Sequence, residues 1–129
     1  MLRVPVTVLH VEDNAIDRII VREAFSEHPE FRLLSASSAS EALALAMHDV
    51  PSVMLLDLHL GDATGVDVIA RFRRDQALAG VPVVILSADD RNATRAAMHQ
   101  AGAFGYLTKP LDVDKLLNLV ASANEENAA

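Results

Sequence analysis

Five short apolar runs alternate with five amphipathic stretches along the chain. The runs cover residues 6–11, 31–35, 52–57, 81–87 and 103–107. Apolar runs of this length, bounded by turn residues, are typical of strands buried in a parallel sheet. Val6–Val11 fits this description well, because it is continuous and rich in β-branched residues.

The stretches between these runs carry apolar residues at helical spacing. In the first stretch, positions i, i+3, i+4 and i+8 are Ile16, Ile19, Ile20 and Ala24, which predicts one apolar helix face. Four of the expected helices have candidate N-caps. These are Asn14, Ser38 in a capping box with Glu41, Asp89 or Asp90, and Asp112. The fourth helix, roughly Arg91 to Ala101, has a mostly alanine face and is expected to bury little.

The strict alternation of strands and helices predicts an α/β fold with a doubly wound parallel sheet. Helices are expected on both faces, joined to the strands by right-handed crossovers. A common strand order for such folds is 2-1-3-4-5. We expect one domain over residues 1–129, with a core of about 6–123 and a polar, frayed tail over 124–129.

Composition and charge narrow the classes of function. The 129 residues carry a formal net charge of −7 and only 4% aromatic residues, which argues against direct binding of nucleic acid. There is no cysteine, and no apolar run approaches the roughly 20 residues that a membrane span needs. We therefore expect a cytoplasmic protein without membrane insertion.

Polar residues stand where four of the predicted strands end. They are Glu12 and Asp13, Asp57, Ser87, and Lys109. Taken singly, each is ordinarily a loop residue or a helix cap. In the order 2-1-3-4-5, however, these strand ends meet in one crevice. Three crowded carboxylates repel one another, and a hard divalent cation such as Mg²⁺ relieves the repulsion.

The same residue types suit phosphoryl transfer. An aspartate can act as a covalent nucleophile and form an aspartyl phosphate. That reaction needs mainly positioning and charge neutralisation. Lys109 can supply a point charge to one phosphoryl oxygen, and the Ser87 hydroxyl can donate a hydrogen bond to another.

Four segments resemble the receiver domain of bacterial two-component response regulators. They are residues 8–14, 55–57, 87–88 and 101–110, and the resemblance extends over about 6–123. It implies that Asp57 is the phosphoacceptor for a histidine kinase or a histidine phosphotransfer protein. It also implies that Glu12, Asp13, Asp57 and the main-chain carbonyl of His59 hold Mg²⁺.

The resemblance assigns further roles. Ser87 and Lys109 would contact the phosphoryl group, and Tyr106 would be the switch aromatic that turns inward. His59 and Asp89 occupy positions that tune phosphoryl lifetime in this family, and the Lys109-Pro110 bond is typically cis. The chain departs from the usual pattern at three positions. Glu12 replaces the commoner Asp, Ser87 replaces Thr, and Gly61 replaces Pro, which predicts a more mobile loop after Asp57.

A downstream protein is expected to bind the surface formed by the fourth helix, the fifth strand and the fifth helix. Candidate contacts are Arg91, Arg95, Met98, Tyr106, Lys115 and Leu119. Such a protein is a signalling switch and not an enzyme, beyond its own phosphoryl transfer and aspartyl-phosphate hydrolysis. Only a short tail follows the fifth helix, so we expect either a stand-alone receiver or a piece of a larger protein such as a hybrid kinase, and Met1 favours the first.

Two other classes of function compete with this interpretation. One is a receiver-like interaction module that takes no phosphate, although such modules typically lose an acidic residue or the lysine. The other is an enzyme. An Asp-nucleophile phosphatase would need a second Asp where His59 stands, and a flavin-binding protein would need a phosphate loop where Glu12 and Asp13 stand.

Overall fold

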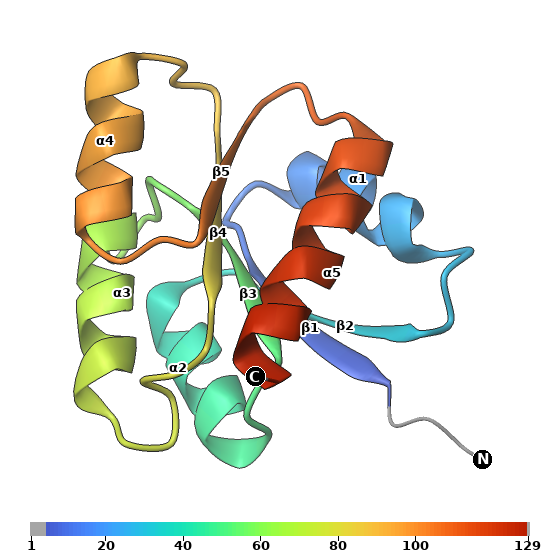
Figure 1. Cartoon of the computed structure of the whole chain (residues 1–129), viewed down its shortest axis with the longest axis horizontal. Coiled ribbons are helices and arrows are strands. Elements are labelled where there is room, and N and C mark those ends of the chain that lie inside the picture. Colours follow the sequence, from blue (N-terminus) through green and yellow to red (C-terminus); the bar gives the residue numbers. More distant parts are fainter. Residues whose placement is uncertain (1–4, 129) are drawn as a thin grey trace.

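Five parallel strands form one sheet in the order β2-β1-β3-β4-β5 (Figure 1). The computed structural model describes residues 5–128. The strands are β1 (Val6–Val11), β2 (Phe31–Ala36), β3 (Val53–Asp57), β4 (Val83–Ser87) and β5 (Gly105–Thr108). The helices are α1 (Ala15–Phe25), α2 (Ala39–His48), α3 (Gly65–Arg74), α4 (Asn92–Gln100) and α5 (Val113–Ala128). The predicted fold class and strand order are confirmed.

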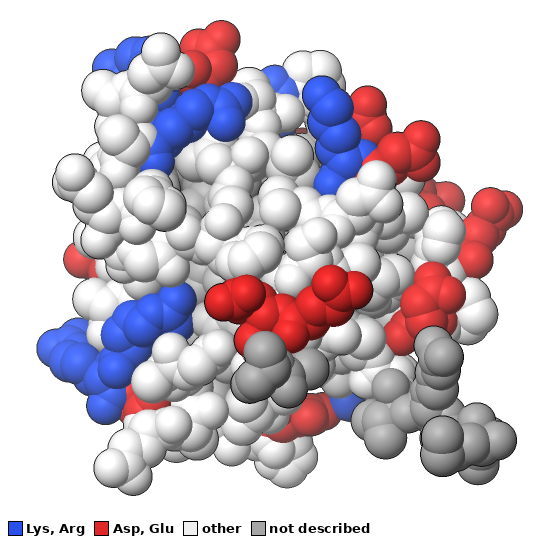
Figure 2. All heavy atoms as spheres, in the orientation of Figure 1, with Lys and Arg blue, Asp and Glu red and all other residues white. Residues whose placement is uncertain are grey.

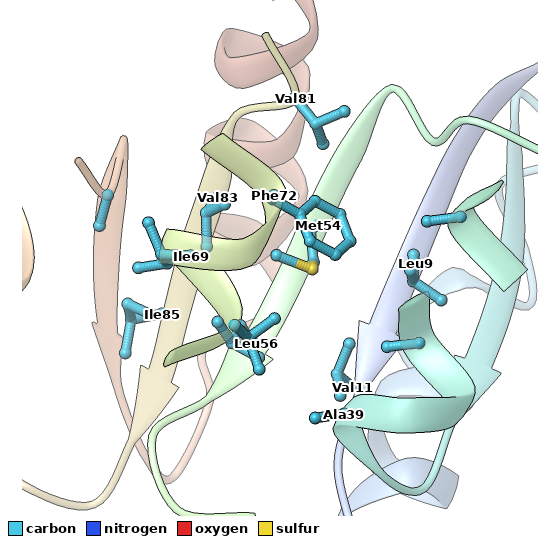
Figure 3. Packing of buried hydrophobic residues seen from close by; sticks show 14 of the residues in the cluster. Leu9, Val11, Ala39, Met54, Leu56, Ile69, Phe72, Val81, Val83 and Ile85 are labelled. Atoms are coloured by element: carbon cyan, nitrogen blue, oxygen red, sulfur yellow. The ribbon is translucent and has the colours of Figure 1, made fainter. Parts of the chain in front are cut away.

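The helices cover both faces of the sheet, with α2, α3 and α4 on one face and α1 and α5 on the other (Figure 1). Successive strand residues point to opposite faces. Leu9 and Leu56 therefore pack toward α2 and α3, where Phe72 fills the space between helix and sheet (Figure 3). Val8 and Leu55 pack toward α1 and α5. The three central strands β1, β3 and β4 are thus buried on both sides, as their continuous apolar sequences predicted, whereas the edge strands β2 and β5 are only partly buried.

The predicted apolar face of α1 is wrong for three of its four residues. Ile16, Ile19 and Ile20 are 68%, 47% and 47% exposed. The helix instead buries Val21, Ala24 and Phe25, which are also spaced i, i+3 and i+4. The helix therefore carries two apolar stripes, and only the one near its C-terminal end packs on the sheet.

The structure confirms three of the four predicted N-caps and contradicts the fourth. The Asn14 and Asp112 side chains accept from the backbone N–H groups of their helices, as expected. Ser38 caps α2, but the Glu41 carboxylate accepts from the Ser37 hydroxyl and does not complete a capping box. Neither predicted aspartate caps α4, whose N-cap residue is Arg91 without a side-chain hydrogen bond.

The end of the chain also differs from the sequence prediction. Helix α5 continues to Ala128, through residues 124–128 that the sequence predicts to be a frayed tail, and Ala129 lies outside the described residues. The Asn127 amide donates to the Ser52 carbonyl at 3.2 Å, which ties the last turn to the loop before β3. Within residues 5–128, no helix is long and apolar enough to cross a membrane.

Candidate functional site

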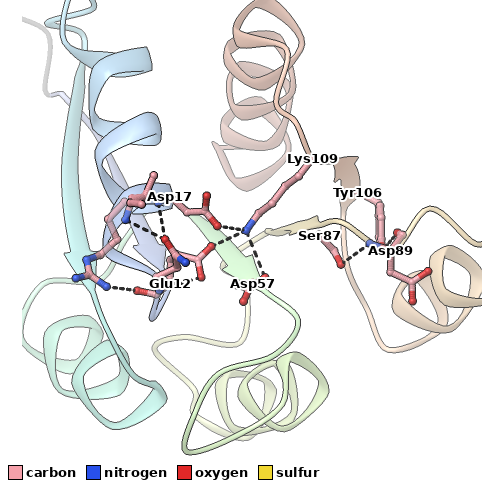
Figure 4. Close-up of polar contacts among 10 residues, drawn as sticks. Glu12, Asp17, Asp57, Ser87, Asp89, Tyr106 and Lys109 are labelled. Atoms are coloured by element: carbon pink, nitrogen blue, oxygen red, sulfur yellow. Dashed lines mark hydrogen bonds and ion pairs between the residues drawn. The ribbon is translucent and has the colours of Figure 1, made fainter.

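The carboxyl ends of four strands bring the predicted site residues together (Figure 4). Glu12 follows β1, Asp57 ends β3, Ser87 ends β4 and Lys109 follows β5. The strand register aligns these ends, since Asp57 pairs with Leu86, and the Lys109 backbone N–H donates to the Ser87 carbonyl at 2.8 Å. The site is therefore a direct product of the sheet order.

Three carboxylates form an acidic cluster at this edge. One oxygen each from Glu12, Asp13 and Asp57 lies within 4.8 Å of the others. Glu12 is buried, Asp57 is half-buried and Asp13 is exposed. Burial raises the pKa of Asp57, and the nearby Asp13 charge raises it further. A cluster of carboxylate oxygens with one open side fits a hard divalent cation that retains water ligands.

Lys109 lies between this cluster and the first turn of α1. Its Nζ donates to Glu12 Oε1 at 2.7 Å and to Asp17 Oδ2 at 2.8 Å, whereas Asp57 Oδ1 is 3.7 Å away (Figure 4). Burial disfavours the charged ammonium, but the hydrogen bonds to Asp17 and Glu12 outweigh it and hold the pKa of Lys109 above its ordinary value. The ammonium is thus charged and held just beyond hydrogen-bond distance of Asp57.

Asp17 is a site residue that the sequence analysis missed. Sequence position marks it only as an acidic residue in the first turn of α1, where it suits the helix dipole. Its pairing with Lys109 joins residues 92 positions apart. No local pattern signals such a contact, because it depends on how α1 and the turn after β5 are placed.

Ser87 and Tyr106 both form hydrogen bonds with the backbone of Asp89. Ser87 is buried, and its Oγ accepts from the Asp89 backbone N–H at 3.1 Å. The Tyr106 hydroxyl donates to the Asp89 carbonyl, and the Arg95 guanidinium lies 4.7 Å from the centre of the Tyr106 ring. The Asp89 carboxylate accepts from Arg91 and Thr94, and the Arg91 hydrogen bonds hold its pKa well below the usual range. This loop therefore connects the Ser87 hydroxyl to the tyrosine.

The loop after Asp57 makes two sets of contacts. His59, which is exposed, forms an isolated bridge with Thr64. The Asp62 carboxylate accepts from the backbone N–H groups of Ala39 and Ser40 at 2.9 and 3.1 Å, at the start of α2. The glycine at position 61 alone suggested a mobile loop, but the Asp62 hydrogen bonds tie the segment to α2.

Five of the six residues predicted to contact a partner are at least partly exposed on the α4–β5–α5 face. Met98 is the exception, because it packs into the core beneath α4. Phe104, which was not predicted, is 37% exposed beside this face. On the face that Figure 2 shows, Lys and Arg lie in separate groups with Asp and Glu between them. This face lacks the continuous basic field that nucleic-acid binding requires.

Comparisons with known proteins agree with this geometry. Residues 8–121 match the family described as response regulator receiver domain. TcrX of Mycobacterium tuberculosis is 34% identical over 113 residues, which cover 88% of this chain and 47% of TcrX. DivK of Brucella ovis, a polar-differentiation response regulator, is 27% identical over 90% of this chain and 94% of its own. The chain thus spans about half the length of TcrX and nearly all of DivK.

Solved structures share the fold. The chemotaxis response regulator CheY4 of Vibrio cholerae has a TM-score of 0.85 at 22% identity, covering 93% of this chain and 99% of CheY4. The Mn²⁺-bound form of the response regulator Rcp1 has a TM-score of 0.74 at 25% identity, covering 92% of this chain and 91% of Rcp1. With its sheet order, its strand-end residues and the match over residues 8–121, the chain belongs to the response regulator receiver domains of two-component systems.

Proposed function

We propose that Asp57 accepts a phosphoryl group from a histidine kinase or a histidine phosphotransfer protein. One observation carries this proposal. Three carboxylates, a charged lysine and a buried hydroxyl lie at the carboxyl ends of β1, β3, β4 and β5, which are neighbours in the sheet (Figure 4). This set can supply a nucleophile, charge neutralisation and a hydrogen-bond donor. An interaction module that takes no phosphate would have no use for the whole set.

We further propose that the acidic cluster holds Mg²⁺ through Glu12, Asp13 and Asp57, together with the main-chain carbonyl of His59. The all-oxygen donor set of the cluster suits this ion. The Mn²⁺-bound form of Rcp1 supports a divalent cation in this fold. When bound, the cation neutralises the crowded carboxylates and the oxygens of the incoming phosphoryl group.

The residues of the chain have distinct tasks in the transfer. An Asp57 carboxylate oxygen forms a bond to phosphorus, while the bond from phosphorus to the donor's histidine nitrogen breaks and its electron pair stays on that nitrogen. Lys109 moves the short distance from Asp17 and Glu12 to pair with a phosphoryl oxygen. The Ser87 hydroxyl donates to a second oxygen.

The loop around Asp89 connects the phosphorylation site to the surface that a downstream protein binds. When Ser87 turns toward the phosphoryl group, the loop shifts and changes the support of Tyr106 and α4. This shift biases the α4–β5–α5 face toward the form that a downstream protein binds. His59 and Asp89 flank the entrance to the site and tune the lifetime of the aspartyl phosphate.

Intact mass after incubation with acetyl phosphate tests this proposal. With Mg²⁺, the wild type is expected to gain the mass of one phosphoryl group, and the adduct should be labile to base. Asp57→Ala should gain nothing, whereas Asp114→Asn, which removes an exposed carboxylate on α5, should gain the group as the wild type does. If neither acetyl phosphate nor a phosphorylated protein donor modifies the wild type, the chain acts by docking alone.

A further inference from the structure

A cavity of about 460 Å³ adjoins the phosphoacceptor site on the face of the sheet that α1 and α5 cover. Its apolar wall includes Val21 of α1, Leu86 of β4 and Leu111 in the turn after β5. Binding sites for small molecules commonly have volumes of about 300–1,000 Å³ and mostly apolar walls. This cavity has the volume and the apolar lining that are typical of small-molecule binding sites.

His10 forms part of the cavity lining and is the unusual residue in it. It lies near the carboxyl end of β1, is only 1% exposed, and neither ring nitrogen has a hydrogen-bond partner among the described residues. Buried polar groups are nearly always hydrogen-bonded, so an unpaired one calls for an explanation. The neighbouring strand residues Val8, Leu9 and Val11 are aliphatic. Packing alone therefore does not require an imidazole here.

The chemistry of the lining limits what can bind. An imidazole has two ring nitrogens that can take part in hydrogen bonds, and those of His10 have no partner among the described residues. The other polar groups of the lining are the Glu12 and Asp17 carboxylates and the Lys109 ammonium. Their formal charges leave an excess of one negative charge, which disfavours an anion.

We propose that this cavity binds a small, uncharged and largely apolar molecule whose single hydroxyl or N–H group pairs with His10, once the ring, whose nitrogens are buried beneath the cavity wall, turns toward it. Binding itself does not depend on the chemistry of Asp57. Lys109 lines the cavity and also approaches Asp57, at 3.7 Å. A bound molecule would therefore contact the lysine that phosphoryl transfer uses, and only this regulatory consequence rests on the proposed function.

Indole and indene provide a matched pair of probes, because they share a bicyclic shape and only indole has an N–H group. The chain contains no tryptophan, so indole fluorescence can be followed during titration with the protein. We expect saturable binding of indole, about tenfold tighter than that of indene, as one added hydrogen bond would give. Indole-3-carboxylate should bind more weakly than indole. Equal affinity for indole and indene, or no saturable binding of indole, would overturn the proposal.

Two variants test whether His10 causes the preference for indole over indene. His10→Leu should bind indole and indene equally, whereas His99→Leu, which changes an exposed histidine on α4, should keep the preference for indole. Amide chemical shifts of the wild type should change at Val21, Leu86 and Leu111, and changes confined to other parts of the molecule would contradict this site. Asp57→Ala should still bind indole, so a failure of the phosphoacceptor proposal and a failure of this one give different results.

Discussion

At the scale of single residues, the position of Lys109 connects the charges of the site. Its ammonium makes two close ion pairs, with Glu12 and Asp17, and stands 3.7 Å from Asp57. Glu12 is shared with the acidic cluster, whereas Asp17 is not part of it. Asp17 is therefore a positioning residue, since it holds Lys109 without belonging to the proposed metal site.

Replacing Asp17 tests whether it positions Lys109 without affecting the proposed metal site. In Asp17→Asn the lysine loses one charged partner and spends more time near Asp57. We expect phosphorylation by acetyl phosphate to become about 2- to 5-fold faster, as the loss of one partly exposed ion pair would allow. The affinity for Mg²⁺ should stay within about twofold, since no proposed ligand changes. The rates can be followed by mass spectrometry over time.

Asp17→Glu is the matched control, because it keeps the charge and should react at nearly the wild-type rate. Equal rates for Asp17→Asn and the wild type would show that Asp17 does not restrain the lysine.

At the scale of elements, the C-terminal end of α3 is held by one side chain. The Arg73 guanidinium donates to the carbonyls of Ala79, Val81 and Gly102, at distances from 2.9 to 3.1 Å. These carbonyls belong to the α3–β4 and α4–β5 loops. One arginine side chain therefore joins the end of α3 to both loops.

Removing this arginine should destabilise the fold. We expect Arg73→Ala to lower the free energy of unfolding by about 1–3 kcal/mol, because it leaves carbonyls without a charged donor. Arg74→Ala removes an exposed arginine from the same helix turn and should change stability by less than about 0.5 kcal/mol. Urea unfolding at neutral pH measures both. Similar losses in the two variants would mean that the effect comes from the helix end and not from the three carbonyls.

The exposed stripe of α1 predicts where a phosphoryl donor docks. Ile16 and Ile19 lie beside Asn14 and Asp17 at the rim of the site, and they contribute little to the core. Large apolar side chains exposed next to a reactive group are typical of interaction surfaces. We expect the protein donor to contact them, which a small donor such as acetyl phosphate does not need to do.

The double variant Ile16→Ser/Ile19→Ser tests this contact. Phosphorylation by the protein donor should slow by about tenfold or more, as the loss of central interface residues would give. Phosphorylation by acetyl phosphate should be unchanged. Met47→Ser removes an exposed apolar residue from α2, away from the site, and should leave both reactions as they are. If the double variant slows both reactions alike, α1 acts on the chemistry and not on docking.

At the scale of the whole molecule, the site carboxylates reduce stability. Burial raises the pKa values of Asp57 and Glu12, so the folded state binds their protons more tightly than the unfolded state does. Each group then lowers the free energy of unfolding as the pH rises from its unfolded pKa through its raised folded pKa. The penalty is complete at pH values above the raised folded pKa of each group.

Asp57→Asn should therefore be more stable than the wild type at pH 7 without metal. The difference should shrink as the pH falls through the raised pKa of Asp57, and disappear near the ordinary pKa of an aspartate. Urea unfolding in EDTA over a range of pH measures it. Adding Mg²⁺ should stabilise the wild type more than the variant. A variant that is less stable than the wild type at every pH would contradict the assigned cause.

Much of the fold and site could be predicted from local pattern. The five apolar runs located every strand, and residues at their ends identified Glu12, Asp13 and Asp57 as an acidic cluster. Two of the wrong predictions share a cause. The α1 face and the exposure of Met98 both depend on what another element places against the helix. Helical periodicity describes one element at a time and cannot supply that information.

The sequence by itself determined the α/β class, the number of strands and the strand ends that carry the chemistry, because these depend on neighbours a few positions apart. Only the tertiary structure decided which stripe of α1 is buried, that Asp17 pairs with Lys109, and that His10 lines a cavity with neither ring nitrogen bonded to a residue within 5–128. Those features arise where α1 meets the sheet and the turn after β5. Contacts between segments far apart in sequence exist only once the sheet has brought the segments together.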